Sequence, residues 1–210
     1  MTYKENKPLL IGAGFGLALL FLLKSDKKES GGVKPSGSVS DFLKKNFPYA
    51  KAAGKITRVP ANVTLTFAAI ESGWGKHAPK FNYFGIKAGS DWKGATSTLK
   101  TPECFNSSTK HLKAEILSVL PPNAPKSFAA CNKRGFYTYW INDKFRAYSS
   151  PAASFLDYGL FLHKHFPKAF QYSDPESFGA YILEHGYATG RYTEKFKTLL
   201  RSVQRITDKL

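Results

Sequence analysis

The feature that most constrains this chain is an apolar helix that ends on a carboxylate. Residues 59–67, Val-Pro-Ala-Asn-Val-Thr-Leu-Thr-Phe, predict a helix entered through a proline, a residue that favours the first helical turn. Val63, Phe67 and Ile70 follow at i, i+4 and i+7, so one face of this helix is apolar and is expected to be buried. Glu71 lies at the edge of that face.

Burial would change the chemistry of Glu71. The predicted helix ends in the turn Gly73-Trp74-Gly75, beside the carboxylate. Desolvation raises the pKa of a carboxyl group, and a proton donor for acid catalysis near neutral pH needs such a shift. A solvated glutamate at a frayed helix end is the alternative. The apolar helix, the indole and the glycines favour a buried carboxyl group that donates a proton.

Net charge narrows the partners that we expect. The 31 Lys and Arg outnumber the 15 Asp and Glu, which gives a formal charge of +16. Residues 1–40 hold six lysines and three acids, so residues 41–210 carry +13. Such a domain is expected to work on a polyanion: nucleic acid, anionic lipid headgroups or bacterial cell-wall polymers. A basic surface kept for solubility is the alternative. The sequence has no nucleic-acid recognition motif, so we expect no nucleic-acid partner.

The cysteines predict no cofactor. Cys104 and Cys131 are the two cysteines, and the sequence has neither Cys-x-x-Cys nor a Cys/His ligand spacing. The pair could form one disulfide in an oxidising compartment. We expect neither a zinc site nor another cofactor.

The N-terminus predicts a membrane anchor joined to a flexible tether. After a short flank, residues 1–7, residues 8–23 form an uncharged run of 16 residues with lysines on both sides. A usual membrane helix has roughly 20 residues, and a signal-peptide core is about as long as this run. No small-x-small cleavage site follows, which favours a single uncleaved transmembrane helix over a cleaved signal. The lysines on both flanks leave its orientation open. Residues 24–40 are polar and rich in Gly and Ser, as flexible tethers are.

The folded domain is expected over residues 41–210, with strands inserted between helices. Ser40-Asp41 predicts a helix N-cap, and a second helix is expected over residues 47–57. From about residue 95 to 148 the pattern is typical of strands, which we place at 96–101, 116–120, 135–141 and, after a turn at Asn142-Asp143, 144–148. Later helices are predicted at 150–166, at 174–185 and from 193 onward. This order predicts an α+β domain.

Five stretches, taken in order, resemble one enzyme family. They are residues 69–75 (Ala-Ile-Glu-Ser-Gly-Trp-Gly), 82–87 (Asn-Tyr-Phe-Gly-Ile-Lys), 92–94 (Trp-Lys-Gly), 145–150 (Phe-Arg-Ala-Tyr-x-Ser) and 186–189 (Gly-Tyr-Ala-Thr). Each motif alone is weak, but five in this order are specific. Across residues 41–207 the chain resembles the family 73 glycoside hydrolases, the endo-β-N-acetylglucosaminidases typified by flagellar muramidase-like domains.

The resemblance implies a lysozyme-like fold, with a mostly helical body and a small antiparallel β-lobe over a cleft. It implies peptidoglycan glycan strands as substrate, cleaved at the β-1,4 bond that follows N-acetylglucosamine. Glu71 matches the catalytic general acid of the family. Glu103, in Thr101-Pro102-Glu103, matches the Thr-x-Glu strand in which the second carboxylate is sought. The alternative for Glu103 is a charged residue on a hairpin.

The second catalytic group is left open by the sequence. Glycoside hydrolysis usually uses two carboxylates, whose separation indicates an inverting or a retaining mechanism, although the 2-acetamido group of a substrate can act as an internal nucleophile. Asp91, next to Trp92, and Asp157, on the helix after the β-lobe, are outside candidates for this group.

The same resemblance implies the remaining site residues. Tyr187 matches the tyrosine of the family's Tyr-Ala-Thr motif, which lines the cleft beside the acid. A core tyrosine between two helices is the alternative. Pyranose rings stack on aromatic side chains, so the candidate sugar platforms are Trp74, Tyr83 and Trp92, whereas Phe84 is expected in the core.

Two further residues are substrate-binding candidates. Asn82 is expected to hydrogen-bond an acetamido group or simply to hold its loop. Tyr192 ends Gly190-Arg191-Tyr192, which departs from the family pattern of an Asp and one more residue before the tyrosine.

Together these observations predict a membrane-anchored peptidoglycan hydrolase. Its catalytic domain is expected in the periplasm or outside the cell, or on the virion membrane of a bacteriophage. The rival interpretation is a non-catalytic cell-wall-binding or structural protein with the same fold. A lytic transglycosylase, which also uses one glutamate on this fold, is the neighbouring enzyme class.

Overall fold

The computed structural model describes residues 37–106, 116–119, 136–187 and 193–210, and the side chains of residues 39–101, 141–187 and 193–210. The predicted anchor, residues 8–23, and most of the tether lie outside this part of the chain, as does Tyr192. None of the helices in the described ranges is long and apolar enough to cross a membrane.

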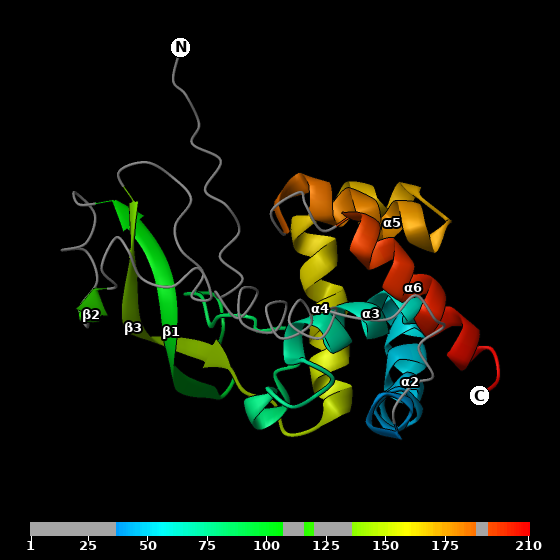
Figure 1. The fold of residues 1–210 in the computed structure, drawn as a ribbon, viewed down its shortest axis with the longest axis horizontal. Helices are drawn as coiled ribbons and strands as arrows, with labels where there is room; N and C mark the ends of the chain where they lie inside the picture. Colours follow the sequence, from blue (N-terminus) through cyan, green and yellow to red (C-terminus); the bar gives the residue numbers. More distant parts are fainter. Residues whose placement is uncertain (1–36, 107–115, 120–135, 188–192) are drawn as a thin grey trace, which may run out of the picture.

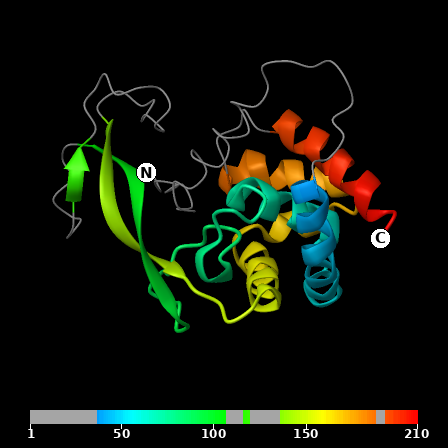
Figure 2. The same ribbon diagram turned by 60° about the horizontal axis from the view of Figure 1, so that its bottom comes forward.

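A helical body surrounds one central helix, α3. Figures 1 and 2 show the helices gathered on one side of the molecule and the sheet on the other. In the described residues α3 packs against each of the other α-helices. The helices are α2 (Gly37–Thr57), α3 (Ala61–Ser72), α4 (Pro151–His165), α5 (Pro175–Ile182) and α6 (Thr193–Thr207), with short helical turns η1 (Pro79–Phe81), η3 (Pro167–Gln171) and η4 (Leu183–Tyr187).

Helix α3 is buried on nearly all sides, more completely than its apolar stripe predicted. The polar residues Thr64 and Thr66 are buried along with Val63, Leu65 and Phe67, because neighbouring helices cover every face. Their hydroxyls donate to the carbonyls of Pro60 and Asn62, one turn earlier, which satisfies them inside the core. Each large apolar side chain buried in this way contributes about 1.5–3 kcal/mol to stability.

Helix α2 differs from the prediction of an N-cap at Ser40-Asp41 and a new helix from residue 47. It begins at Gly37 and continues through Pro48 to Thr57. A proline inside a helix costs about 3 kcal/mol, but here one buried face runs past it on both sides. The side chains on that face are Phe42, Leu43, Asn46, Ala50 and Ala53. Packing against α3 and α4 therefore outweighs the local preference for a break.

The β-lobe is a three-stranded antiparallel sheet in the order β1-β3-β2, made by β1 (Thr96–Asn106), β2 (Ile116–Val119) and β3 (Phe136–Arg146). The predicted turn at Asn142-Asp143 is wrong, because these residues pair with Lys100 and Leu99 inside one continuous strand. Ile141 and Phe145 are buried while Asn142 and Lys144 are exposed, which is the alternation of a strand. Asp143 keeps its place in the strand through an ion pair with Lys87 at 2.9 Å.

The helices after the lobe begin where the sequence predicts, whereas α5 ends at Ile182, three residues before the predicted end, and gives way to η4. The Ser150 hydroxyl accepts from the backbone N–H of Ala153 at 3.3 Å and caps α4. The Asp174 carboxylate accepts from that of Ser177 at 2.7 Å and caps α5. Gly186, with φ of 101°, takes the left-handed conformation near the end of η4.

A cluster of three polar side chains joins the lobe to the body. The Arg146 guanidinium donates to both carboxylate oxygens of Asp157, at 3.0 and 2.8 Å, and the Tyr148 hydroxyl donates to Asp157 at 2.7 Å. Asp157, an outside candidate for the second carboxylate, therefore fastens the end of β3 to α4. Burial, and then the charge of Asp157, raises the pKa of Tyr148.

Candidate active site

Glu71 lies in the last turn of α3, and only 7% of its surface is exposed. Its Oε1 is buried and has no hydrogen-bond partner within the described part of the chain. Burial raises the pKa of Glu71 well above its ordinary value. The predicted environment is therefore confirmed: this carboxyl group retains a proton at a pH where an exposed glutamate has lost it.

The turn after Glu71 is held by its neighbour Ser72. The Ser72 hydroxyl donates to Ala68 O at 2.5 Å and accepts from the backbone N–H of Gly75 at 2.8 Å. Gly73 caps the helix in the left-handed region at φ 56°, as predicted, and Trp74 also has a positive φ, 61°. These contacts fix the backbone immediately beyond the acid.

Two tyrosines from separate elements pack against Phe67, which lies one turn before Glu71 on α3. Tyr187, from η4, is 2% exposed, and Tyr158, from α4, is fully buried. Burial raises the pKa of both phenols, and the charge of Glu71 raises it further. The Tyr187 ring lies 4.8 Å from that of Phe67, so this residue packs in the core between helices. Its place in the cleft beside the acid stays a prediction.

Tyr83 and Asn82 both make contacts within the protein. Tyr83 is 6% exposed, and its ring packs on Phe42 and Phe155, at 6.2 and 5.6 Å between centroids, so it offers no open face to a sugar. The Asn82 amide donates to Ile86 O at 3.0 Å and accepts from Ile86 N–H at 3.1 Å. Asn82 therefore holds its loop, and its acetamido contact stays a prediction. Phe84 lies in the core as expected.

The two tryptophans keep part of their surface exposed. Trp74 is half-buried, with its ring edge-on to Phe42 at 5.9 Å. Trp92 is also half-buried. Its Nε1 donates to Ala95 O at 2.9 Å and the Arg146 guanidinium lies 4.6 Å from its ring centre. Both remain candidates for sugar stacking. Asp91 forms an exposed ion pair with Lys164, and so belongs to the surface.

Glu103 lies on β1, opposite Tyr139 of β3. The β-strand placement of this candidate is confirmed, but its side chain lies outside the described residues, as do those of Cys104 and Cys131. Its separation from Glu71 is therefore not part of the described geometry, and its role stays a prediction. Tyr192 is likewise outside the described chain.

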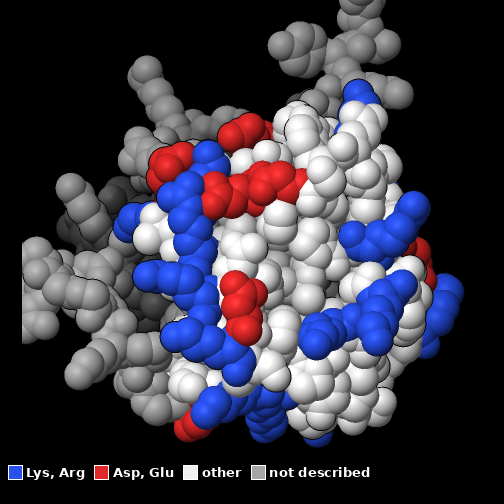
Figure 3. Space-filling view, turned by 90° about the vertical axis from the view of Figure 1, so that its right-hand side faces the viewer, with Lys and Arg blue, Asp and Glu red and all other residues white. Residues whose placement is uncertain are grey.

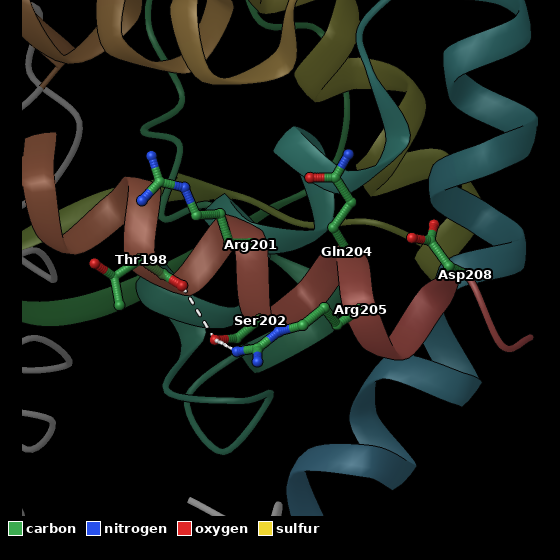
Figure 4. A pocket seen from close by; sticks show the side chains of 6 residues that line it. All are labelled: Thr198, Arg201, Ser202, Gln204, Arg205 and Asp208. Carbon is green, nitrogen blue, oxygen red and sulfur yellow. Dashed lines mark hydrogen bonds between the residues drawn. The ribbon is translucent and has the colours of Figure 1, made fainter. Parts of the chain in front are cut away.

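The surface around α6 offers no rival catalytic site. Figure 3 shows Lys and Arg side chains on both sides of a largely uncharged strip, with Asp and Glu side chains between them, on the face that carries α6 and the C-terminus. A groove of about 540 Å³ lies there, lined from α6 and its C-terminal turn by Thr198, Arg201, Ser202, Gln204, Arg205 and Asp208 (Figure 4). Arg201 is already paired with Glu176, at 2.5 and 2.8 Å. Within the described ranges no cluster of His, Cys, Asp and Glu could hold a metal ion.

A helical body, a small antiparallel lobe and one buried carboxyl group at the end of the central helix define a lysozyme-like α+β glycoside hydrolase fold. The family model described as mannosyl-glycoprotein endo-beta-N-acetylglucosaminidase matches residues 47–205. The chain belongs to this glucosaminidase family, the family 73 glycoside hydrolases.

Individual relatives agree with the family assignment. The chain is 28% identical over 186 residues to the peptidoglycan hydrolase FlgJ of Salmonella typhimurium, covering 83% of this chain and 49% of FlgJ. It is 30% identical over 178 residues to FlgJ of Pseudomonas aeruginosa, covering 80% of this chain and 37% of that protein. The chain thus spans half or less of the length of these relatives.

Solved structures show the same fold. The glycoside hydrolase domain of Salmonella typhimurium FlgJ matches with a TM-score of 0.58 at 24% identity, covering 81% of this chain and 91% of that domain. The catalytic domain of the autolysin Auto from Listeria monocytogenes matches with a TM-score of 0.59 at 21% identity, covering 90% and 96%.

Proposed function

We propose that this chain hydrolyses peptidoglycan glycan strands at the β-1,4 bond that follows N-acetylglucosamine, with Glu71 as the general acid. The observation that carries the proposal is the buried Glu71 carboxyl group, whose pKa burial raises well above its ordinary value and whose Oε1 has no hydrogen-bond partner in the described residues. Membership of the glucosaminidase family supports the proposed site of cleavage. The relatives named peptidoglycan hydrolases support peptidoglycan as the substrate.

In the proposed reaction the neutral Glu71 gives its proton to the glycosidic oxygen as the bond from C1 to that oxygen breaks. A water molecule supplies hydroxide to C1, and its proton passes to the second group, after which Glu71 is reprotonated. We propose Glu103 as this second group, acting on the water or stabilising the positive charge at C1. The substrate's own acetamido oxygen is the competing nucleophile. A general acid contributes about 10²–10⁴ to such a rate.

Binding of the glycan is proposed to use aromatic surfaces near the acid. Trp74 follows Glu71 by three residues and Trp92 lies beside Arg146 and Tyr148, so both can present a ring face to a pyranose. Tyr187 is buried beside Glu71, and we propose that it positions the acid as well as the sugar. Tyr192 is retained as a binding residue on the resemblance alone.

We further propose that residues 8–23 anchor the domain in a membrane, with catalysis in the periplasm or outside the cell. The run is uncharged and flanked by lysines, and the +13 carried by residues 41–210 suits an anionic cell wall. A virion membrane of a bacteriophage is the alternative location. Fractionating cells that produce the full chain tests the anchor, because deletion of residues 8–23 would move the protein from the membrane to the soluble fraction.

Release of reducing ends from purified peptidoglycan tests the catalytic proposal. The full chain is compared with Glu71→Gln, which keeps the size of the side chain and removes its transferable proton. Glu184→Gln, at an exposed glutamate in η4, is the matched control. We expect Glu71→Gln to lose activity by about 10²-fold or more while the control keeps it. A wild type no more active than Glu71→Gln would leave only the non-catalytic wall-binding role. Anhydro-muramyl ends in the product masses would identify a lytic transglycosylase instead.

A further inference from the structure

Three polar groups from three elements share one apolar interior beside the proposed acid. They are Oε1 of Glu71 and the hydroxyls of Tyr158 and Tyr187, all of them buried. The remaining helices against α3 contribute no ionisable side chain to this interior, since α2, α5 and α6 bury only apolar residues, a glycine, Asn46, Thr57 and Thr207 in the described chain. Of the three groups, Tyr158 has no role in the function proposed so far.

The ring of Tyr158 is held in one position. It stacks on Phe84 with 3.8 Å between centroids and 3° between planes. The Tyr187 ring stands edge-on to it, at 6.2 Å and 78°, and Phe67 packs on a further side at 6.1 Å. Because these contacts enclose the ring, the hydroxyl stays inside the core and cannot swing out to solvent.

Stability alone does not explain the Tyr158 hydroxyl. Burying a hydroxyl without a strong partner costs about 1–3 kcal/mol, and phenylalanine would make the same ring contacts without that cost. The Tyr158 ring stands edge-on to that of Tyr187, and the charge of Glu71 acts on both phenols. In the described residues the buried Tyr158 hydroxyl has no hydrogen-bond partner, so its proton is available to the Glu71 carboxylate.

We propose that Tyr158 is a positioning residue for the general acid: together with Tyr187 it forms a hydroxyl pair that orients Glu71 and stabilises its carboxylate after proton transfer. This inference rests on the proposed function. Glu71 and the two hydroxyls are buried, so little solvent reaches the carboxylate formed when Glu71 gives up its proton, and hydroxyl donors take over its stabilisation. No bond of either tyrosine is broken, and Glu71 regains a proton at the end of the cycle.

Tyr158→Phe in the full chain tests the inference through the pH dependence of kcat/KM on peptidoglycan. Loss of a donor to the carboxylate disfavours ionisation of Glu71, so the alkaline limb of the profile is expected to move to higher pH. A hydrogen bond to a charged group is worth about 1.5–3 kcal/mol, so kcat/KM near neutral pH is expected to fall about tenfold or more. Tyr49→Phe, which removes a hydroxyl from a half-buried tyrosine that packs on Phe155, is the control and should keep the wild-type profile.

A second probe does not depend on removing the hydroxyl. Incorporation of 3-fluorotyrosine at position 158 keeps the ring and makes the hydroxyl a stronger donor, so the alkaline limb should move to lower pH. A Tyr158→Phe variant that loses stability but keeps the wild-type limb, or a fluorotyrosine protein with an unmoved limb, overturns the proposal. If instead the wild type is no more active than Glu71→Gln, the proposed function fails first, and this inference fails with it.

Discussion

The burial of Glu71 predicts that the residue proposed to carry catalysis destabilises the fold. Its pKa is raised in the folded chain, so the native state retains a proton that the unfolded chain releases. Between the unfolded and folded pKa values, stability therefore falls as pH rises. Glutamine at position 71 has the shape of the protonated acid and no proton to lose. Glu71→Gln is accordingly expected to be more stable than the wild type at neutral pH, although we expect it to lose activity.

The size of this effect follows from one proton. A single group that is protonated only in the native state changes the free energy of unfolding by about 1.4 kcal/mol per pH unit. Below about pH 4.3, where glutamate is protonated in both states, wild type and Glu71→Gln should have similar stability. Above this pH the free energy of unfolding of Glu71→Gln should exceed that of the wild type by an amount that grows with the same slope. The difference levels off once the pH reaches the pKa of Glu71 in the folded chain.

Urea unfolding of the full-length wild type and variant at several pH values between 4 and 8, at constant ionic strength, measures this difference. The control is again Glu184→Gln, whose exposed carboxylate should give a difference that does not follow this slope. A Glu71→Gln variant that is less stable at every pH, or a difference that does not change with pH, would refute the conclusion that Glu71 is buried and protonated.

Two further predictions concern the scaffold. Asp157→Ala leaves the half-buried Arg146 guanidinium without its two hydrogen bonds, so the free energy of unfolding should fall by about 3 kcal/mol. Urea unfolding at low and high salt measures this loss. A loss under 0.5 kcal/mol would contradict the prediction. Gly179→Ala places a Cβ 2.2 Å from a ring carbon of Phe196. Thermal unfolding should show a loss of about 1–3 kcal/mol from overpacking, and an unchanged or higher Tm would show that α5 and α6 can separate.

Local signals explain which parts of the fold the sequence predicted correctly. The helix end at Gly73, the cap at Ser150 and the cap at Asp174 depend on residues within one turn of each other, so their spacing in the sequence is enough. The proton-donor environment of Glu71 was predictable for the same reason, because the apolar helix and the glycine turn adjoin it in the chain.

Where the predictions failed, contacts between distant segments overrode local preference. The predicted turn at Asn142-Asp143 is a strand because β1 pairs with it. The predicted start of a new helix at residue 47 lies inside one continuous helix, because one buried face extends across it. Tyr83 resembled a sugar platform in its motif, yet Phe42 and Phe155 enclose its ring. Turn and breaker propensities are worth a few kcal/mol at most, and the burial of several side chains exceeds that.

By itself the sequence determined the proposed acid, its place at the end of a buried helix and the family to which the chain belongs. Only the tertiary structure decided which groups surround that acid. Tyr158 and Tyr187 are separated along the chain from Glu71 and from each other, and the packing of α4 and η4 brings their rings together on Phe67 of α3. A carboxyl group's proton affinity depends on this enclosure, since desolvation and donor placement arise from residues that no local pattern connects.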